Sequence, residues 1–203
     1  MRGVAFIFLC FLTQSSFAQF PSESWHEGKV VLLSGDTLIG AVKYNLDRDI
    51  IQLNDTKTIE AYTARKVLFF TIFDKTVSRH RQFYAIPYNV TIEYKTPIFF
   101  EVLYEGKLTF LGREYITIQT TSYGPALGSG SYSRRVLSFR YYFLDANGKI
   151  TLYSTNKKEL LNYMSKYRND VNAYMKKNRL HYDDKEDLIY IVQYYNTLIN
   201  PKN

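Results

Sequence analysis

The feature that most constrains the fold of this chain is a series of short β-prone runs between Gly28 and Tyr153. Valine, isoleucine, tyrosine, phenylalanine and threonine dominate these runs, and such residues favour strands. Turn residues separate neighbouring runs, most clearly at Ser34-Gly35-Asp36, Glu105-Gly106 and Asp145-Ala146-Asn147-Gly148. Because few helical intervals lie between the runs, the spacing predicts an antiparallel β meander or curled sheet.

The expected strands follow directly from the runs. We expect them at residues 29–33, 38–44, 50–53, 59–62, 67–73, 78–85, 88–94, 99–104, 107–111, 115–121, 136–144 and 150–153. Between the last long pair, residues 124–133 are rich in glycine and serine, and we expect a loop there.

Two C-terminal helices are expected after the strands. Asn156 and Glu159 have the spacing of a capping box, and the second helix begins at Asp183 or Asp184 and ends before Pro201. Each helix carries one apolar stripe, formed by Leu160, Met164, Tyr167, Val171 and Tyr174 in the first and by Leu188, Ile191, Val192, Tyr195 and Ile199 in the second. The fold class expected is therefore α+β, with both helices packed on the mainly antiparallel sheet.

The first 18 residues have the pattern of a secretory signal peptide. Arg2 precedes an apolar run of about ten residues, which is too short to span a bilayer, and Ser16 and Ala18 suit a cleavage site before Gln19. We therefore expect three segments: 1–18 as the signal peptide, 19–153 as the β-rich region, and 154–203 as a helical pair in the same domain. The single cysteine, Cys10, lies in the first segment, so the mature chain has no disulfide, which favours a bacterial periplasmic or surface location.

No motif defines a chemical reaction. The three histidines lack metal-ligand spacing, residues 124–133 lack the endings of a phosphate-binding loop or a nucleophile elbow, and no cofactor, metal or catalytic residue is expected. Aromatic and cationic residues flank that expected loop, and we take them as candidate contacts for a ligand or partner: Tyr123, Tyr132, Arg134 and Arg135. The formal net charge of +7 suits an anionic partner, although nucleic acid does not suit an exported protein without a recognition motif.

Four phrases of the chain resemble a group of uncharacterised exported proteins of the Bacteroidota. They are Gly28-Lys-Val-Val-Leu-Leu-Ser-Gly-Asp-Thr-Leu-Ile-Gly40, Tyr62-Thr-Ala-Arg-Lys-Val67, Phe100-Glu-Val-Leu-Tyr-Glu-Gly-Lys-Leu108, and the closing Asp187-Leu-Ile through Tyr194-Tyr195-Asn196. The resemblance implies export and a β-rich body with C-terminal helices. It implies no catalytic residue and no cofactor.

The function we expect is a non-enzymatic envelope protein that binds a protein, a glycan or an anionic lipid. The alternative is a hydrolase acting on envelope glycan, whose carboxylates would converge from distant strands. Two facing carboxylates in a cleft would favour the hydrolase, whereas an exposed apolar or basic patch without them would favour the binding protein. No segment of the mature chain is long and apolar enough to span a membrane as a helix.

Overall fold

The computed structural model describes residues 20–89, 94–124 and 130–200. One antiparallel sheet of ten strands runs through them, in the order β10-β9-β8-β7-β6-β5-β1-β2-β3-β4. Consecutive strands are neighbours everywhere except where β5 pairs with β1. The predicted antiparallel sheet is thus confirmed. The strands are β1 (His26–Leu32), β2 (Thr37–Asn45), β3 (Ile50–Asn54), β4 (Ile59–Thr63), β5 (Val67–Asp74), β6 (Arg79–Asn89), β7 (Lys95–Tyr104), β8 (Thr109–Tyr123), β9 (Gly130–Leu144) and β10 (Ile150–Tyr153).

The predicted turn between the first two strands is confirmed. The Leu32 N–H donates to the Asp36 carbonyl at 2.9 Å, which closes the hairpin. Gly35 has a φ of +96°, a conformation that glycine adopts without a steric penalty. The local sequence therefore determines how β1 and β2 are connected.

Several of the expected strand boundaries were wrong; β7, for example, begins at Lys95, whereas the sequence predicted a start at residue 99. The runs expected at 107–111 and 115–121 form one strand, β8, because their backbone pairs with β9 without interruption. The run expected at 78–85 continues to Asn89 in β6, and Pro87 lies directly opposite Pro97 of β7. The expected strand at 88–94 extends into residues 90–93, which lie outside the described part of the chain.

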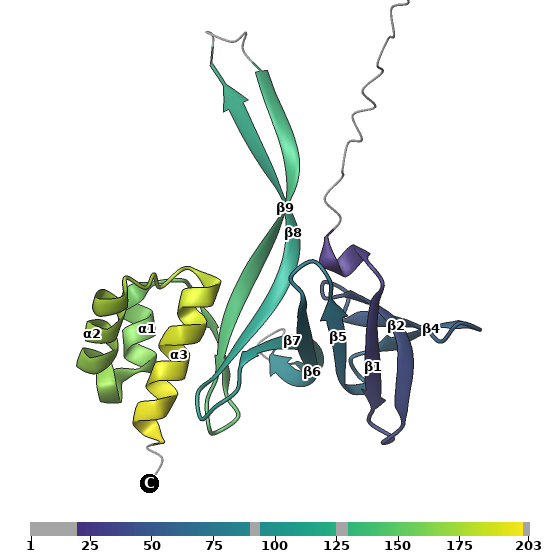
Figure 1. The fold of residues 1–203 in the computed structure, drawn as a ribbon, viewed down its shortest axis with the longest axis horizontal. Coiled ribbons are helices and arrows are strands. Elements are labelled where there is room, and N and C mark those ends of the chain that lie inside the picture. The colour runs from purple at the N-terminus through teal and green to yellow at the C-terminus, as the bar shows by residue number, and fades with distance from the viewer. Residues whose placement is uncertain (1–19, 90–93, 125–129, 201–203) are drawn as a thin grey trace, which may run out of the picture.

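The sheet curls so that β2 approaches β8, although four strands lie between them in the sheet order. Asp49, in the turn after β2, accepts a hydrogen bond from the Phe99 N–H of β7 at 2.8 Å and forms an ion pair with Arg113 of β8 at 2.8 Å. The concave side encloses a core of buried apolar side chains from β1 to β7, including Val30, Phe70 and Phe83. Figure 1 shows this curled half of the sheet on the side away from the helices.

The C-terminal segment forms three α-helices, whereas the sequence predicted two. They are α1 (Lys157–Tyr163), α2 (Arg168–Asn178) and α3 (Lys185–Ile199), and a 3₁₀ turn, Ser165–Tyr167, separates the first two. Both predicted N-caps are confirmed: Asn156 accepts from the N–H groups of Lys158 and Glu159, and Asp184 accepts from Asp187. The reciprocal bond of the expected capping box differs, because the Glu159 carboxylate accepts from the Ser154 N–H at 3.1 Å. None of the helices in the described residues is long and apolar enough to cross a lipid bilayer.

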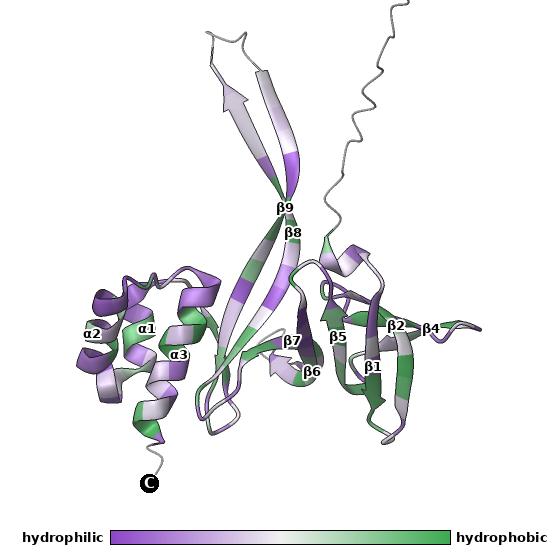
Figure 2. Cartoon of the chain, in the orientation of Figure 1, coloured by the Kyte–Doolittle hydropathy of each residue, from purple (hydrophilic) through white to green (hydrophobic). Residues whose placement is uncertain are grey.

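The helices pack against the end of the sheet formed by β8, β9 and β10. Leu160, Met164, Leu188 and Ile191 are fully buried there, together with aromatic side chains from the strands such as Phe110. Figure 2 shows green, apolar segments alternating with purple, hydrophilic ones along the helices, as amphipathic helices require.

Asn196 of α3 fixes the register between helix and sheet. Its side chain donates to the Leu108 carbonyl at 2.9 Å and accepts from the Leu108 N–H at 3.1 Å. It also donates to the Val192 carbonyl of its own helix at 2.9 Å. Since a buried backbone group without a partner costs about 1–3 kcal/mol, this amide both stabilises and orients α3.

Candidate functional site

The strands β8 and β9 extend far beyond the rest of the sheet as a two-stranded projection, which we call the arm. Pairing of β8 with β7 stops at Gly112, and pairing of β9 with β10 stops at Tyr141. The arm therefore consists of residues 113–123 and 130–140, which pair only with each other. From Ile118 outward nearly every side chain is exposed. Figure 1 shows the arm extending away from both the helices and the curled half of the sheet.

The four candidate contact residues all lie on the arm, but on different faces. Cross-strand pairing sets Gln119 opposite Arg134 and Tyr123 opposite Gly130. Because side chains alternate along a strand, Tyr123, Tyr132 and Arg134 share one face. Arg135 points to the opposite face.

The face that carries Tyr123, Tyr132 and Arg134 is held in place by contacts across the arm. The Arg134 guanidinium donates to the Gln119 side-chain oxygen at 2.9 and 3.1 Å. A Cβ placed on Gly130 would lie 2.4 Å from the Tyr123 hydroxyl, so this ring lies across the glycine of the facing strand. Tyr132 is 54 % exposed and presents most of its ring to solvent.

The expected loop at 124–133 is shorter than the sequence predicted. Gly130 and the three residues after it belong to β9, paired with the end of β8. Residues 125–129 lie outside the described part of the chain. The prediction was wrong because it relied on composition, and glycine and serine are uncommon in strands. Here, pairing with the threonines and tyrosine of β8 determines the structure of these residues.

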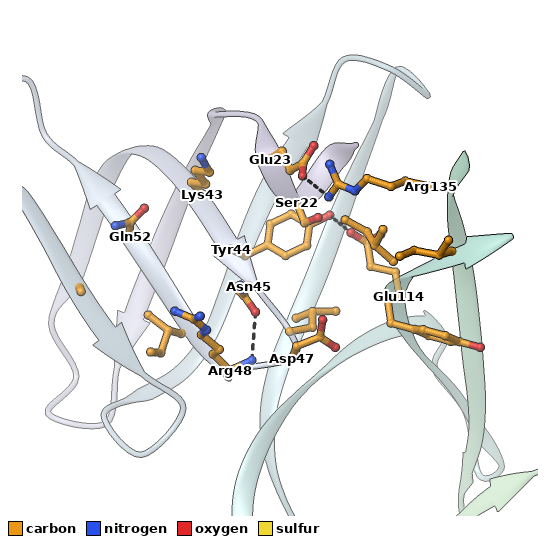
Figure 3. A pocket seen from close by; sticks show the side chains of 16 residues that line it. Ser22, Glu23, Lys43, Tyr44, Asn45, Asp47, Arg48, Gln52, Glu114 and Arg135 are labelled. Carbon is orange, nitrogen blue, oxygen red and sulfur yellow. Dashed lines mark hydrogen bonds and ion pairs between the residues drawn. The ribbon is translucent and has the colours of Figure 1, made fainter. Parts of the chain in front are cut away.

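Arg135 contributes to a second feature, a pocket of about 820 Å³ at the base of the arm. Its guanidinium forms an ion pair with Glu23 at 2.5 Å and lies over the Phe20 ring, 5.1 Å from the centroid. Figure 3 shows this pair at the rim and Tyr44 and Glu114 meeting deeper in the pocket. Residues of the β2–β3 hairpin, among them Lys43 and Arg48, line the other side.

A buried ion network joins the pocket to the interior of the sheet. The Arg81 guanidinium donates to both Glu101 oxygens at 2.8 Å and to Glu114 Oε2 at 2.7 Å. It also donates to Asp74 Oδ2 at 3.1 Å and to the Tyr44 hydroxyl at 2.8 Å. All five N–H donors of the guanidinium are thus used. With one cation and three carboxylates, the network has a formal charge of 1 − 3 = −2.

Protonation in this network follows from burial and hydrogen bonding. Burial raises the pKa of the Tyr44 hydroxyl well above its ordinary value, so the group stays neutral and donates to Glu114 Oε1 at 2.6 Å. Burial also works against the charged form of Asp74, but hydrogen bonds from Thr76 and Arg81 outweigh it and hold its pKa below the usual value. Burial also works against the charged form of Arg81, but the hydrogen bond and negative charge of Glu101 outweigh it and raise the pKa of the guanidinium.

The pocket offers polar and charged groups for binding, and its acidic lining residues are Glu23, Asp47 and Glu114. Both oxygens of Glu114 already accept hydrogen bonds, one from Tyr44 and one from Arg81. Glu23 is engaged by Arg135. Within residues 20–89, 94–124 and 130–200, no group of three or more histidine, cysteine, aspartate or glutamate side chains is arranged to hold a metal ion.

Sequence reasoning missed the ion network completely. Its members lie on four strands and the end of a fifth, separated by up to 70 positions for the Tyr44–Glu114 hydrogen bond. The sequence did contain a signal of buried charge. Glu101 interrupts the apolar run Phe99-Phe100-Glu101-Val102, and Arg81 lies two positions before Phe83, on the same buried face of the strand. A charged residue at a core position indicates a buried partner, although the partner itself is not identified by such a pattern.

No protein-family model, curated protein or solved structure matches this chain.

Proposed function

We propose that the protein is an exported, non-enzymatic binding module whose arm contacts a component of the cell envelope. The arm is the observation that carries this proposal. A two-stranded ribbon alone is marginally stable in water, and the outer half of this one buries almost no side chain. Its length therefore adds little to the stability of the core and suits contact with another molecule.

The composition of the arm supports a binding role. From residue 115 to 144 the chain has no aspartate or glutamate, whereas arginine occupies positions 134, 135 and 140. Tyrosine, serine, threonine and glycine make up most of the outer half, and Figure 2 shows it in pale and purple, polar colours. Rigid aromatic rings with small hydroxyl residues are typical of binding surfaces that adapt to a partner.

The alternative, a glycan hydrolase, receives less support from the pocket. A pair of catalytic carboxylates needs one group able to donate a proton and another with a free oxygen. Three acidic residues line the pocket. Both oxygens of Glu114 accept hydrogen bonds, Glu23 is paired with Arg135, and Asp47 is exposed in the turn after β2.

A site-specific photocrosslinker tests the binding role of the arm. We would replace Tyr132 by a benzoylphenylalanine residue and, as a matched control, Tyr190 on α3, since each tyrosine is 54 % exposed. After irradiation in the native host, we expect an adduct of higher mass from the Tyr132 position alone. Equal labelling at both positions, or none at position 132, would contradict a binding function of the arm.

Export is tested separately by intact-mass analysis of the protein from the envelope fraction of the native host. The proposal expects a mature chain beginning at Gln19 or within a residue or two of it. Retention of Met1 in that fraction would refute the signal peptide.

A further inference from the structure

The outer edge of β9 in the arm has no neighbouring strand among the described residues. Along its whole length β9 pairs with β8 on one side, but on the other side β10 covers only Tyr141 to Leu144. Residues 130–140 therefore form one edge of the arm. Of these, positions 131–135 are exposed and 136–139 partly so.

The pairing pattern shows which backbone groups point outward from this edge. The Asp145 N–H donates to the Lys149 carbonyl at the turn between β9 and β10, and the register continues to Tyr141 opposite Tyr153. In an antiparallel pair, alternate residues direct both backbone groups to the same neighbour. Odd-numbered residues of β9 thus face the β10 side and even-numbered ones face β8. In the arm, the N–H and C=O groups of Ser131, Ser133, Arg135 and Leu137 therefore point away from β8.

Most of the usual protections of an edge strand are lacking on this strand. Natural edge strands are kept from pairing with other chains by proline, by charged side chains such as lysine, by bulges or by short length, and of these β9 carries only the charges of its three arginines. Residues 130–140 contain neither proline nor lysine, and the register with β8 shows no shift along them. A regular strand with outward-pointing donors and acceptors is a template for an additional strand.

The side chains beside this edge indicate the chemistry of the added strand. Three arginines lie on β9 itself, at positions 134, 135 and 140, and the described residues of the arm contain no acidic residue other than Glu114 at its base. Opposite charges facing each other across strands contribute about 0.2–1 kcal/mol per pair, and like charges are destabilising. A second copy of the arm would place arginines beside arginines, so charge favours a different, acidic partner.

We propose that the arm captures an extended acidic peptide segment of a partner protein, which adds to the β9 edge as a further strand. This inference rests on the proposed binding function and names its partner class. Backbone hydrogen bonds to Ser131, Ser133, Arg135 and Leu137 hold the segment. Its alternate acidic side chains lie beside Arg134 and Arg140, which share one face of the arm. Serine hydroxyls and the Tyr132 ring line the remaining positions without obstructing the backbone.

Binding can be measured with two synthetic peptides in a fluorescence anisotropy titration of the full mature protein. The first alternates glutamate with valine or threonine over about eight residues, the length that spans this edge. The second has lysine in place of every glutamate. We expect the acidic peptide to bind at least about tenfold more tightly, with the difference reduced at high salt.

Backbone pairing is tested by a matched pair of double variants. Ser131→Pro with Ser133→Pro removes two outward N–H donors and leaves the hydrogen bonds to β8 intact. Ser131→Ala with Ser133→Ala keeps the donors and removes only the hydroxyl groups. We expect the proline variant to weaken binding of the acidic peptide at least about tenfold and the alanine variant to change it less than about twofold. An unchanged circular dichroism spectrum shows that each variant is folded.

Amide hydrogen exchange gives an independent readout that needs no variant. In the free protein the amides of Tyr132 and Arg134 should be protected by pairing with β8, whereas those of Ser131 and Ser133 should exchange rapidly. The acidic peptide should slow the second pair and leave the first nearly unchanged. Absence of binding, equal binding of the lysine peptide, or binding without protection of Ser131 and Ser133 would each overturn strand addition.

Failure of this proposal is distinguishable from failure of the proposed function. If the peptide result is negative and the crosslink at Tyr132 still forms, the arm binds a partner through its side chains and strand addition is wrong. If neither occurs, the binding function itself fails.

Discussion

Replacing Arg81 with methionine removes the guanidinium from the centre of the curled sheet and keeps an unbranched side chain. In the wild-type protein this group is 5 % exposed and makes hydrogen bonds to three carboxylates and to Tyr44. Removing one partner of a buried ion pair costs about 3–5 kcal/mol. Because three buried carboxylates lose the same cation, we expect Arg81→Met to lower the unfolding free energy by at least about 4 kcal/mol near pH 7. The total unfolding free energy of a domain is typically about 5–15 kcal/mol, so this loss would be a large part of it.

The pH dependence gives this prediction a second, sharper form. The folded pKa of Asp74 lies below its value in the unfolded chain, so its stabilising contribution is present above that unfolded value and is lost as pH falls through the folded one. Without Arg81 this contribution is reduced. The difference between wild type and variant should therefore shrink as the pH is lowered from about 7 toward about 3.

Urea unfolding followed by tyrosine fluorescence measures these free energies. Two further variants keep the test informative if Arg81→Met does not fold. Arg81→Lys retains the charge and loses the forked geometry, so its stability should be intermediate. Arg81→Met combined with Glu101→Gln and Glu114→Gln removes two unpaired charges and should recover about 2 kcal/mol or more. A loss below about 1 kcal/mol for Arg81→Met, unchanged between neutral and acidic pH, would refute the reasoning.

Three other outcomes follow from the packing. Asn196→Leu should lower the unfolding free energy by about 2–4 kcal/mol because both backbone groups of Leu108 lose their partner, whereas the exposed control Asn178→Ala should change it by less than about 0.5 kcal/mol in the same urea titration. Tyr44→Phe should lower the unfolding free energy by about 1–3 kcal/mol near pH 7. Because the pKa of Tyr44 is raised in the folded protein, the wild-type protein loses stability as the pH rises above about 10. Denaturant titrations between about pH 9 and 11 should therefore show a smaller loss of stability for the variant. A fragment of residues 19–153, ending at Tyr153, should be unfolded or insoluble because it exposes the apolar face that the helices cover, and a protease-resistant fragment that melts like the mature chain would contradict this.

Elements defined by local chemistry were predictable from the sequence. Gly35 permits the positive φ of the first turn, and Asn156 and Asp184 cap their helices as expected. Each of these structures is determined by a few neighbouring residues. Their physical causes, a steric allowance for glycine and a side-chain acceptor for free N–H groups, can be read from a short segment.

The break between α1 and α2 shows where the same reasoning fails. The apolar spacing from Leu160 to Tyr174 fits one helix, yet the chain turns at Met164, whose φ of −102° and ψ of 27° are not helical. Met164 is fully buried, and Met175 is buried further on, whereas Tyr174 stacks at the surface on Tyr194 with ring centroids 4.0 Å apart. Packing against the sheet thus overrides a periodicity that was consistent with a continuous helix.

The arrangement of the arm depends on the same kind of non-local information. Arg134 and Arg135 are adjacent in the sequence, and in a loop both could reach one ligand. In a paired strand they point to opposite faces, so Arg134 joins the tyrosines while Arg135 reaches Glu23 at the pocket. That ion pair lies midway along the arm, and the buried network at Glu114 lies at its base. The interactions that hold the arm to the rest of the protein therefore lie in its inner half, and the backbone groups along the outer edge of β9 remain available for the proposed added strand.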